Sequence, residues 1–381
     1  MVLCGRVIAL CTLGICIAAG AISAPAAAQA PVDVSTVDTL MLRLMTTYDV
    51  PGASLALIKG GGIVLEKSYG LRDLTTRAPV TAQTLFNIGS ISKSFTALAV
   101  AQLVDQNTLD LDRPIIGYAP DLRLSEPRVT RAVTLRQLLS HSSGLPPDEQ
   151  WPRQVPPSRQ GIIREFATMP ITAEPGTRFQ YCSRCVVLAA YVLERVTSQT
   201  WETYTRTQIF APLGMTTASF GPSGLQRSTD GAQPYQHEQV SGHTKVPWGR
   251  LEYLDPLDPA GGIDASIDDL TRYALFQLGD GMMQGRRLLT AQMMAELHRP
   301  EIAVDPSWTS APIRELHHAL GWFTGEYHGM RLVYHNGVNP GFRAAIVLVP
   351  SAKAGVVLLT NGDSSRFTEA ATLTLLDQFF R

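Results

Sequence analysis

A serine and a lysine three residues apart, Ser90 and Lys93, stand just before a long apolar stretch at 97–104. Such a stretch is typical of a buried helix, and the three-residue spacing puts both side chains on one face of that helix. Burial lowers the pKa of an amine, and an uncharged lysine can take a proton from a serine hydroxyl. At a helix start, the backbone N–H of Ser90 can also bind a developing oxyanion. The pattern requires a fold that buries Lys93 beside Ser90, and it predicts that Ser90 is a nucleophile.

A simpler interpretation of the same pair is that Ser90 caps a core helix and that Lys93 extends to water. Ser90 is the only serine in the chain with a lysine three residues later. So short a motif also arises by chance, so other motifs must decide between the two interpretations.

Strand patterns occur at both ends of the chain, and helical patterns fill its middle. Two strands at 53–58 and 63–69 flank a glycine-rich turn and predict a hairpin. Further strands are predicted at 320–327, 332–334, 344–349 and 355–360. Helices are predicted at 37–47, 92–106, 134–140, 158–167, 184–197, 203–210, 267–278, 291–298 and 368–380.

This order of elements predicts an α+β fold. One antiparallel sheet is built from both chain ends and flanked by helices, and an all-helical region is inserted into it. We expect the α/β part at about 31–80 and 285–381, and the mostly helical part at about 81–284. Residues 220–262 have no period of their own and are expected to be an irregular lid or substrate wall.

The first residues have the pattern of a secretory signal peptide. Arg6 precedes an apolar segment at 7–22, and small residues follow at 24–30. We expect cleavage after Ala28, so that the signal peptide is 1–28, the domain is 29–381 and the protein is periplasmic or secreted. An uncleaved anchor is the alternative. Cys182 and Cys185 are then the only cysteines of the mature chain.

Charge and motif content argue against several classes of function. The 381 residues include 32 basic and 33 acidic side chains, which indicates neither a nucleic-acid surface nor a polybasic membrane patch. His237 and Glu238 begin an H-E-x-x-H motif, but residue 241 is serine, so catalytic metal is not indicated. No serine lies in a G-x-S-x-G elbow, and no cofactor is expected.

Two further motifs decide the interpretation of the Ser90 pair. One runs from Glu174 to Ser183 before a predicted helix, and the other runs from His335 to Phe342 after a predicted strand. With the phrases at 138–145, 212–215 and 259–262, they make the chain resemble the β-lactamase-related serine hydrolases. This family includes class C β-lactamases, D-Ala-D-Ala carboxypeptidases, D-amino-acid peptidases and β-lactamase-like esterases. The resemblance covers nearly all of the mature chain and implies a β-lactamase/transpeptidase-like fold.

The resemblance also implies roles for individual residues. Ser90 is the acylated nucleophile, Lys93 its proton acceptor, and Tyr181 a second acid/base with a depressed pKa. The backbone N–H groups of Ser90 and Val338 form the oxyanion hole, Val338 lying on an edge strand. Gly337 is explained by the close approach of an acyl group to that strand.

Two departures from the family pattern bear on the substrate. Where the family usually has Tyr-x-Asn, this chain has Ser183, so a shorter hydroxyl stands where an amide would hold a substrate carbonyl. Where class C β-lactamases have Lys-Thr-Gly, this chain has His335, Asn336 and Gly337. A histidine that is largely neutral at pH 7 replaces a fixed cation, which favours the peptidase and esterase branches.

Four other residues are candidates for supporting roles. We expect His141 to be structural, and Arg343 to be a surface arginine at a strand end rather than a ligand of a substrate carboxylate. Cys182 and Cys185 have a helical i, i+3 spacing that brings their Cα atoms within disulfide range, so they form either a local disulfide or two small buried side chains.

The sequence therefore predicts an exported serine hydrolase. Its expected substrates are small esters, D-amino-acid amides or peptidoglycan-type peptides. One alternative is a class C-like β-lactamase, and another is a non-catalytic module that binds penicillin or peptidoglycan. The sequence leaves the oligomeric state open.

Overall fold

The structure is a computed structural model that describes residues 33–238 and 242–380. The predicted signal peptide, 1–28, lies outside the described residues. Among the helices of the described part, none combines the length and the apolar character that a membrane crossing requires.

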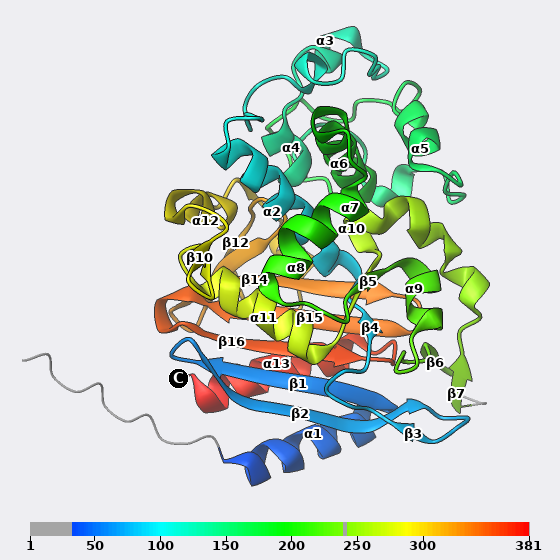
Figure 1. The fold of residues 1–381 in the computed structure, drawn as a ribbon, viewed down its shortest axis with the longest axis vertical. Helices are drawn as coiled ribbons and strands as arrows, with labels where there is room; N and C mark the ends of the chain where they lie inside the picture. The colour runs from blue at the N-terminus through cyan, green and yellow to red at the C-terminus, as the bar shows by residue number, and fades with distance from the viewer. Residues whose placement is uncertain (1–32, 239–241, 381) are drawn as a thin grey trace, which may run out of the picture. The chain divides into compact units, whose positions relative to one another are not determined.

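A nine-stranded antiparallel sheet contains strands from both chain ends (Figure 1). The pairing of β16 with β1 joins the C-terminal strands to the N-terminal hairpin. The predicted sheet built from both chain ends is confirmed. In sheet order, the strands are β11 (Ile302–Ala303), β12 (Arg314–His318), β13 (Phe323–Tyr327), β14 (Met330–Asn339), β15 (Phe342–Val349), β16 (Ala354–Thr360), β1 (Gly52–Lys59), β2 (Gly62–Asp73) and β3 (Ala78–Pro79).

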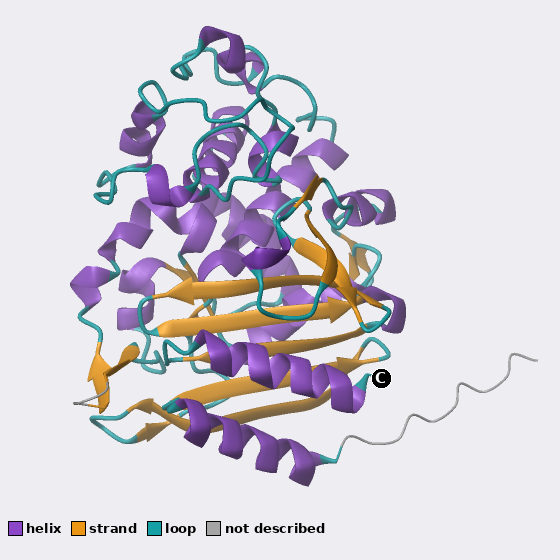
Figure 2. Ribbon diagram, turned by 180° about the vertical axis from the view of Figure 1, so that it is seen from behind, coloured by secondary structure: helices purple, strands orange, loops and turns teal. Residues whose placement is uncertain are grey.

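Two helices cover one face of this sheet, α1 (Val34–Tyr48) and α13 (Ser365–Phe379) (Figure 2). The buried residues of α1 include Val37, Leu40 and Leu44, the i, i+3, i+7 spacing of an amphipathic helix. They belong to one apolar cluster with residues of β1, β16 and α13. Hydrophobic periodicity therefore places these two helices on the sheet.

The remaining helices lie on the other face, around α2 (Ser92–Asp105). Every residue of α2 from Ser92 to Leu103 is buried. A helix that is apolar all round must lie inside the molecule, and α2 packs between the sheet and the other helices (Figure 1). These are α3 (Pro127–Thr130), α4 (Leu135–Leu139), α5 (Arg159–Glu165), α6 (Ser183–Thr197), α7 (Trp201–Thr205), α8 (Ala211–Leu213), α9 (Gly221–Arg227), α10 (Asp258–Gly261), α11 (Ile267–Leu278) and α12 (Ala291–Leu297).

The structure corrects two expectations about the middle of the chain. The inserted region is not all helical, and residues 220–262 are not irregular throughout, since α9, α10 and a short hairpin lie within them. The strands of this region pair either with distant segments or within local hairpins. All are two to four residues long, too short for a sequence period. They are β4 (Phe86–Asn87), β8 (Ile263–Ala265) and β5 (Ser219–Phe220) in one sheet, β6 (Tyr235–Glu238) with β7 (Gly242–Lys245), and β9 (Met282–Met283) with β10 (Arg286–Arg287).

Candidate active site

Ser90 lies in a single turn of 3-10 helix, η1 (Gly89–Ile91), directly before α2. Lys93 is in the first turn of α2, is 1% exposed, and places Nζ 2.9 Å from Ser90 Oγ. The same Nζ donates to the backbone carbonyl of Ala260 at 2.8 Å. A neutral Lys93 amine donates one hydrogen bond to this carbonyl, and its nitrogen lone pair remains available to accept the proton of the Ser90 hydroxyl.

Burial lowers the pKa of Lys93 to about 8, against an opposing attraction from Asp148. The predicted lowering of the Lys93 pKa by burial is therefore present in the structure. With this pKa about a tenth of the Lys93 amine is uncharged at pH 7, and only the uncharged form can accept a proton.

Tyr181 lies beside this pair, with the centre of its ring 4.8 Å from Lys93 Nζ. Burial raises the pKa of Tyr181 well above its ordinary value, although a hydrogen bond with Ser90 opposes the shift. The expected depression of this pKa is wrong, because the buried ring loses more solvation than the hydrogen bond returns. Tyr181 is a neutral phenol, which can donate a hydrogen bond and relay a proton.

Two glycines allow η1 to lie directly against β14. A Cβ on Gly89, whose φ is +53°, would stand 2.6 Å from the backbone nitrogen of Val338. A Cβ on Gly337 would stand 1.9 Å from the carbonyl oxygen of Ile88. The expectation that Gly337 allows an acyl group to approach this strand is therefore wrong. The group that approaches Gly337 is the protein's own backbone, at the carbonyl of Ile88.

The expectation that Val338 lies on an edge strand is also corrected in part. β14 is an interior strand of the sheet, not an edge strand. However, the β13–β14 pairing ends at Tyr334, while the β14–β15 pairing continues to Asn339. Beyond Tyr334 the β13 side of β14 therefore faces the cavity that Ser90 lines, and Val338 is 52% exposed there.

His335 is nearly fully buried, with Nδ1 2.7 Å from the carbonyl oxygen of Asn336. Burial and the nearby Lys93 lower the pKa of His335 to about 3. The expectation that His335 is neutral at pH 7 agrees with this shift. Burial likewise lowers the pKa of the neighbouring His141 and His318. This side of the site thus holds neutral imidazoles where class C β-lactamases have a cation.

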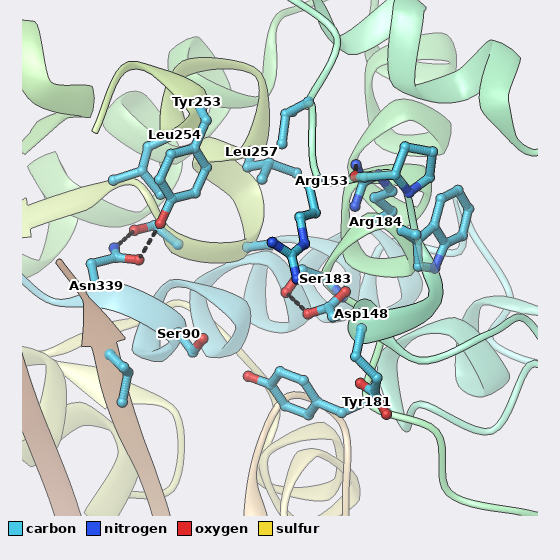
Figure 3. Close-up of a pocket in the computed structure, with 17 residues that line it drawn as sticks. Ser90, Asp148, Arg153, Tyr181, Ser183, Arg184, Tyr253, Leu254, Leu257 and Asn339 are labelled. Carbon is cyan, nitrogen blue, oxygen red and sulfur yellow. Dashed lines mark hydrogen bonds between the residues drawn. The ribbon is translucent and has the colours of Figure 1, made fainter. Parts of the chain in front are cut away.

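Ser183 is joined to a carboxylate that the sequence did not single out. Its hydroxyl donates to Asp148 Oδ2 at 2.6 Å, and its backbone N–H donates to Oδ1 at 2.7 Å (Figure 3). Because Asp148 accepts the hydroxyl hydrogen, Ser183 presents oxygen lone pairs to a substrate rather than a donor.

The cavity at Ser90 has two lobes, both lined by Ser90, Tyr181 and Val338. The polar lobe has a volume of about 600 Å³, and the Arg153 side chain extends into it (Figure 3). The aromatic lobe has a volume of about 330 Å³. Further residues of the polar lobe are Asp148, Glu149, Trp151, Ser183 and Tyr253, and those of the aromatic lobe are Trp308, Phe323, Tyr334, His335 and Asn336.

The four supporting residues have structural contacts. His141 Nδ1 accepts from the backbone N–H of Cys182 at 3.1 Å, which fixes the segment that carries Tyr181. Cys182 and Cys185 form a disulfide with a Cα–Cα distance of 5.3 Å, one of the two alternatives left open by the sequence. Arg343 donates to backbone carbonyls at its own strand end, including that of Asn339, as the structural interpretation expects.

Sequence reasoning missed several groups that line the site. Asp148, Tyr253 and Trp308 lie in turns or 3-10 segments, where no periodicity marks them. Asn339 was within the second motif but was given no role, and its amide donates to Asn87 and to the carbonyl of Gly261. This buried network ties β14 to the turn before Ser90 and to the segment that carries Ala260.

Comparison with known proteins gives matches over most of the chain. A family model described as Beta-lactamase matches residues 37–378. Protein flp of Staphylococcus aureus (strain COL) is 26% identical over 331 residues, which are 86% of this chain but only 63% of that protein. Penicillin-binding protein 4 of Amycolatopsis lactamdurans is 28% identical over 331 residues, 86% of this chain and 85% of that protein. An octameric penicillin-binding protein homologue from Pyrococcus abyssi shares the fold with a TM-score of 0.79 at 27% identity, over 92% of this chain and 78% of that one.

The fold, the site and these matches define a class, the proteins that are similar to β-lactamases and penicillin-binding proteins. The chain belongs to the Beta-lactamase family, as the resemblance of its motifs implied. Its fold is β-lactamase/transpeptidase-like, which confirms the predicted fold class.

Proposed function

We propose that this protein is an exported serine hydrolase that forms an acyl-enzyme at Ser90. Its proposed substrates are small esters, D-amino-acid amides or peptidoglycan-type peptides. The observation that carries the proposal is the 2.9 Å contact between Ser90 Oγ and a buried Lys93 amine beside Tyr181. The predicted signal peptide and the Cys182–Cys185 disulfide support export, since disulfides persist in oxidising compartments.

In the proposed mechanism, Ser90 Oγ attacks the substrate carbonyl while its proton passes to Lys93. The backbone N–H groups of Ser90 and Val338 bind the oxyanion, and the proton then passes through Tyr181 to the leaving alcohol or amine. In a second step, water attacks the acyl-enzyme and gives its proton to the same pair of residues. That proton returns to Ser90 Oγ as the bond between Oγ and the acyl group breaks, which releases the acid and the free serine.

The aromatic lobe favours substrates that place no carboxylate in it. None of the described residues that line the aromatic lobe is a lysine or arginine, and the pKa of His335 is about 3. The polar lobe is of mixed charge, since Asp148, Glu149, Arg153 and Arg184 all line it. The aromatic lobe suits an apolar or planar acyl or alcohol group.

A substrate panel tests this proposal. The purified protein is incubated with p-nitrophenyl esters, a chromogenic cephalosporin and a D-Ala-D-Ala peptide, and intact mass is recorded alongside turnover. We expect turnover of esters or of the peptide, with a transient acyl adduct. Cephalosporin turnover that exceeds both would favour the class C-like alternative. A stable adduct, or binding without turnover of any substrate, would favour the non-catalytic module.

The substitution His335→Lys tests the role of the missing cation. We expect it to raise kcat/KM for the cephalosporin relative to that for the ester about tenfold to a hundredfold, the scale of a new charge-assisted contact. The ratio is the quantity to measure, because a second cation near Lys93 changes its pKa for both substrates alike. His328→Lys, which adds the same charge at an exposed turn, is the matched control. A ratio that falls in His335→Lys contradicts the argument.

A further inference from the structure

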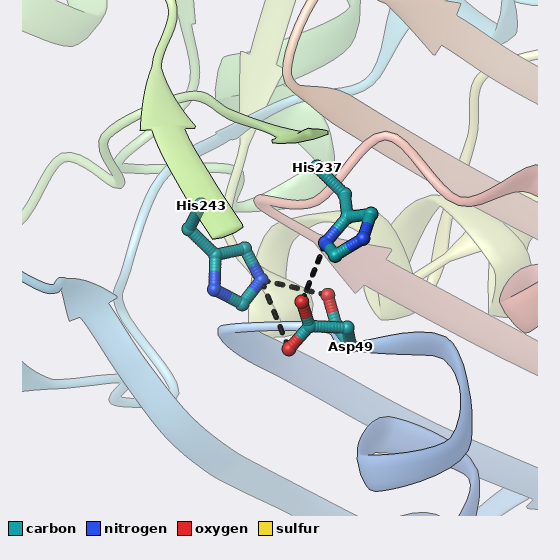
Figure 4. A group of neighbouring side chains, drawn as sticks. All are labelled: Asp49, His237 and His243. Atoms are coloured by element: carbon teal, nitrogen blue, oxygen red, sulfur yellow. Dashed lines mark hydrogen bonds and ion pairs between the residues drawn. The ribbon is translucent and has the colours of Figure 1, made fainter. Parts of the chain in front are cut away.

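A second cluster of polar side chains consists of Asp49, His237 and His243 (Figure 4). Asp49 ends α1, and the two histidines are cross-strand partners on β6 and β7. His237 Nδ1 lies 2.6 Å from Asp49 Oδ2, and His243 Nε2 lies 3.5 Å from Oδ1. The carbonyl oxygen of Asp49 is 2.7 Å from the same His243 nitrogen. Two imidazoles thus face one carboxylate that is almost two hundred residues away in sequence.

From this arrangement we infer that Asp49, His237 and His243 bind one divalent transition-metal cation, with Zn²⁺ as the best fit. Imidazole nitrogen and carboxylate oxygen are common zinc ligands, at about 2.0–2.2 Å from the metal. At those bond lengths a tetrahedral site separates its ligand atoms by roughly 3.3–3.5 Å. The three ligand atoms here lie within 4.8 Å of one another.

To reach metal geometry, the widest pair of ligand atoms must come closer by no more than about 1.5 Å. The His243–Asp49 pair already has a suitable separation, and the His237–Asp49 pair must open by less than about 1 Å. The side chains of Asp49 and His237 are nearly half exposed, so both can shift and water can reach a fourth position. The backbones are better fixed, since the N–H of His237 donates to Asp363 Oδ1 at 3.2 Å.

This site differs from the metal motif that the sequence argument excluded. H-E-x-x-H places two histidines on one turn of a helix, whereas His237 and His243 meet across paired strands. Sequence spacing alone does not reveal such a pair, and it brings Asp49 into no motif. The cluster is separate from the residues that line the cavity at Ser90.

A bound cation would join the β6–β7 hairpin to the end of α1. The chain continues from β7 into two 3-10 segments, η5 (Trp248–Arg250) and η6 (Glu252–Leu257). Tyr253 and Leu254 of η6 line the polar lobe, and the Tyr253 hydroxyl donates to Asn339 Oδ1 at 3.3 Å. The metal therefore has a stabilising role, holding one end of a segment that leads to the site wall.

The test is zinc binding by the full chain, prepared without a histidine tag and freed of metal with EDTA. Isothermal titration with ZnCl₂ should give one site per chain, and Zn²⁺ should raise the Tm. His237→Ala, His243→Ala and Asp49→Asn should each weaken binding at least roughly a hundredfold, since even outer-shell substitutions cost about ten- to a hundredfold. Asparagine suits Asp49 because it tolerates the left-handed φ of +52° there. His328→Ala, at another exposed histidine, should leave binding unchanged.

A measurement on the unaltered protein guards against variants that do not fold. Co²⁺ should give the visible absorption of a low-symmetry four-coordinate site, and Zn²⁺ should displace it. Failure of the folded wild-type protein to bind either metal would overturn the inference. Binding of equal strength in wild type and in the double variant His237→Ala/His243→Ala would overturn it as well.

Discussion

Ser90→Ala is expected to abolish covalent labelling of the protein by a fluorophosphonate or β-lactam probe. The wild-type chain should gain the mass of one adduct, because Ser90 Oγ has a proton acceptor at 2.9 Å and lines both lobes of the cavity. Hydrolysis of whichever substrate proves active should fall by at least about 10³-fold, since the loss of a nucleophile removes the whole acyl-transfer route. Intact-mass spectrometry and initial rates measure the two effects.

Ser94→Ala is the matched control for this experiment. Ser94 lies next to Lys93 on α2, but its hydroxyl donates to the carbonyl of Ile91 and accepts from Tyr273. This variant should therefore keep the label. Labelling that persists in a folded Ser90→Ala protein would remove Ser90 from the mechanism.

The elements that the sequence predicted well are those set by local patterns. The hairpin of β1 and β2 follows from two strands and a glycine-rich turn, and its register pairs Lys59 with Gly62. α2 follows from its largely apolar sequence, and the same sequence supplies the burial that shifts the pKa of Lys93. Both features depend on residues close together in sequence, so the amino-acid sequence alone is enough to predict them.

The features that the sequence missed depend on contacts between distant segments. Asp148 meets Ser183 across 35 residues, and no period marks a single carboxylate in a loop. The carbonyl that holds Lys93 belongs to Ala260, and its role becomes visible only once α10 lies against α2. Trp308 comes to the aromatic lobe from a 3-10 turn between β11 and β12.

The two wrong physical arguments share one cause. The expected low pKa of Tyr181 considered a neighbouring lysine but not the burial of the ring, which has the larger effect. Gly337 was explained by an absent substrate, whereas the carbonyl of Ile88 already occupies the space above it. In both cases packing within the protein outweighs the partner that the motif suggested.

Lys93→Arg is expected to reduce the rate of acylation by roughly 10²-fold or more, the usual scale for loss of a general base. Arginine keeps the positive charge but does not give up its proton, so the substitution separates electrostatic attraction from proton transfer. Lys67→Arg is the matched control, because Lys67 makes a partly exposed ion pair with Asp38. Near-normal turnover by Lys93→Arg would show that the base lies elsewhere.

The pH dependence of the wild-type protein gives an independent test of the same base. Only the uncharged form of Lys93 accepts a proton, and burial places its pKa at about 8. The acylation rate should therefore rise about tenfold per pH unit below that value and level off above it. Tyr181 cannot produce this rising limb of the pH profile, since its pKa is raised and the phenol stays neutral throughout the pH range of the profile. In Lys93→Arg the limb should disappear along with the rate, because an arginine stays protonated at every pH in the profile. A limb near pH 8 that persists in Lys93→Arg would assign it to another group, so the profile and the substitution together identify which amine takes the proton.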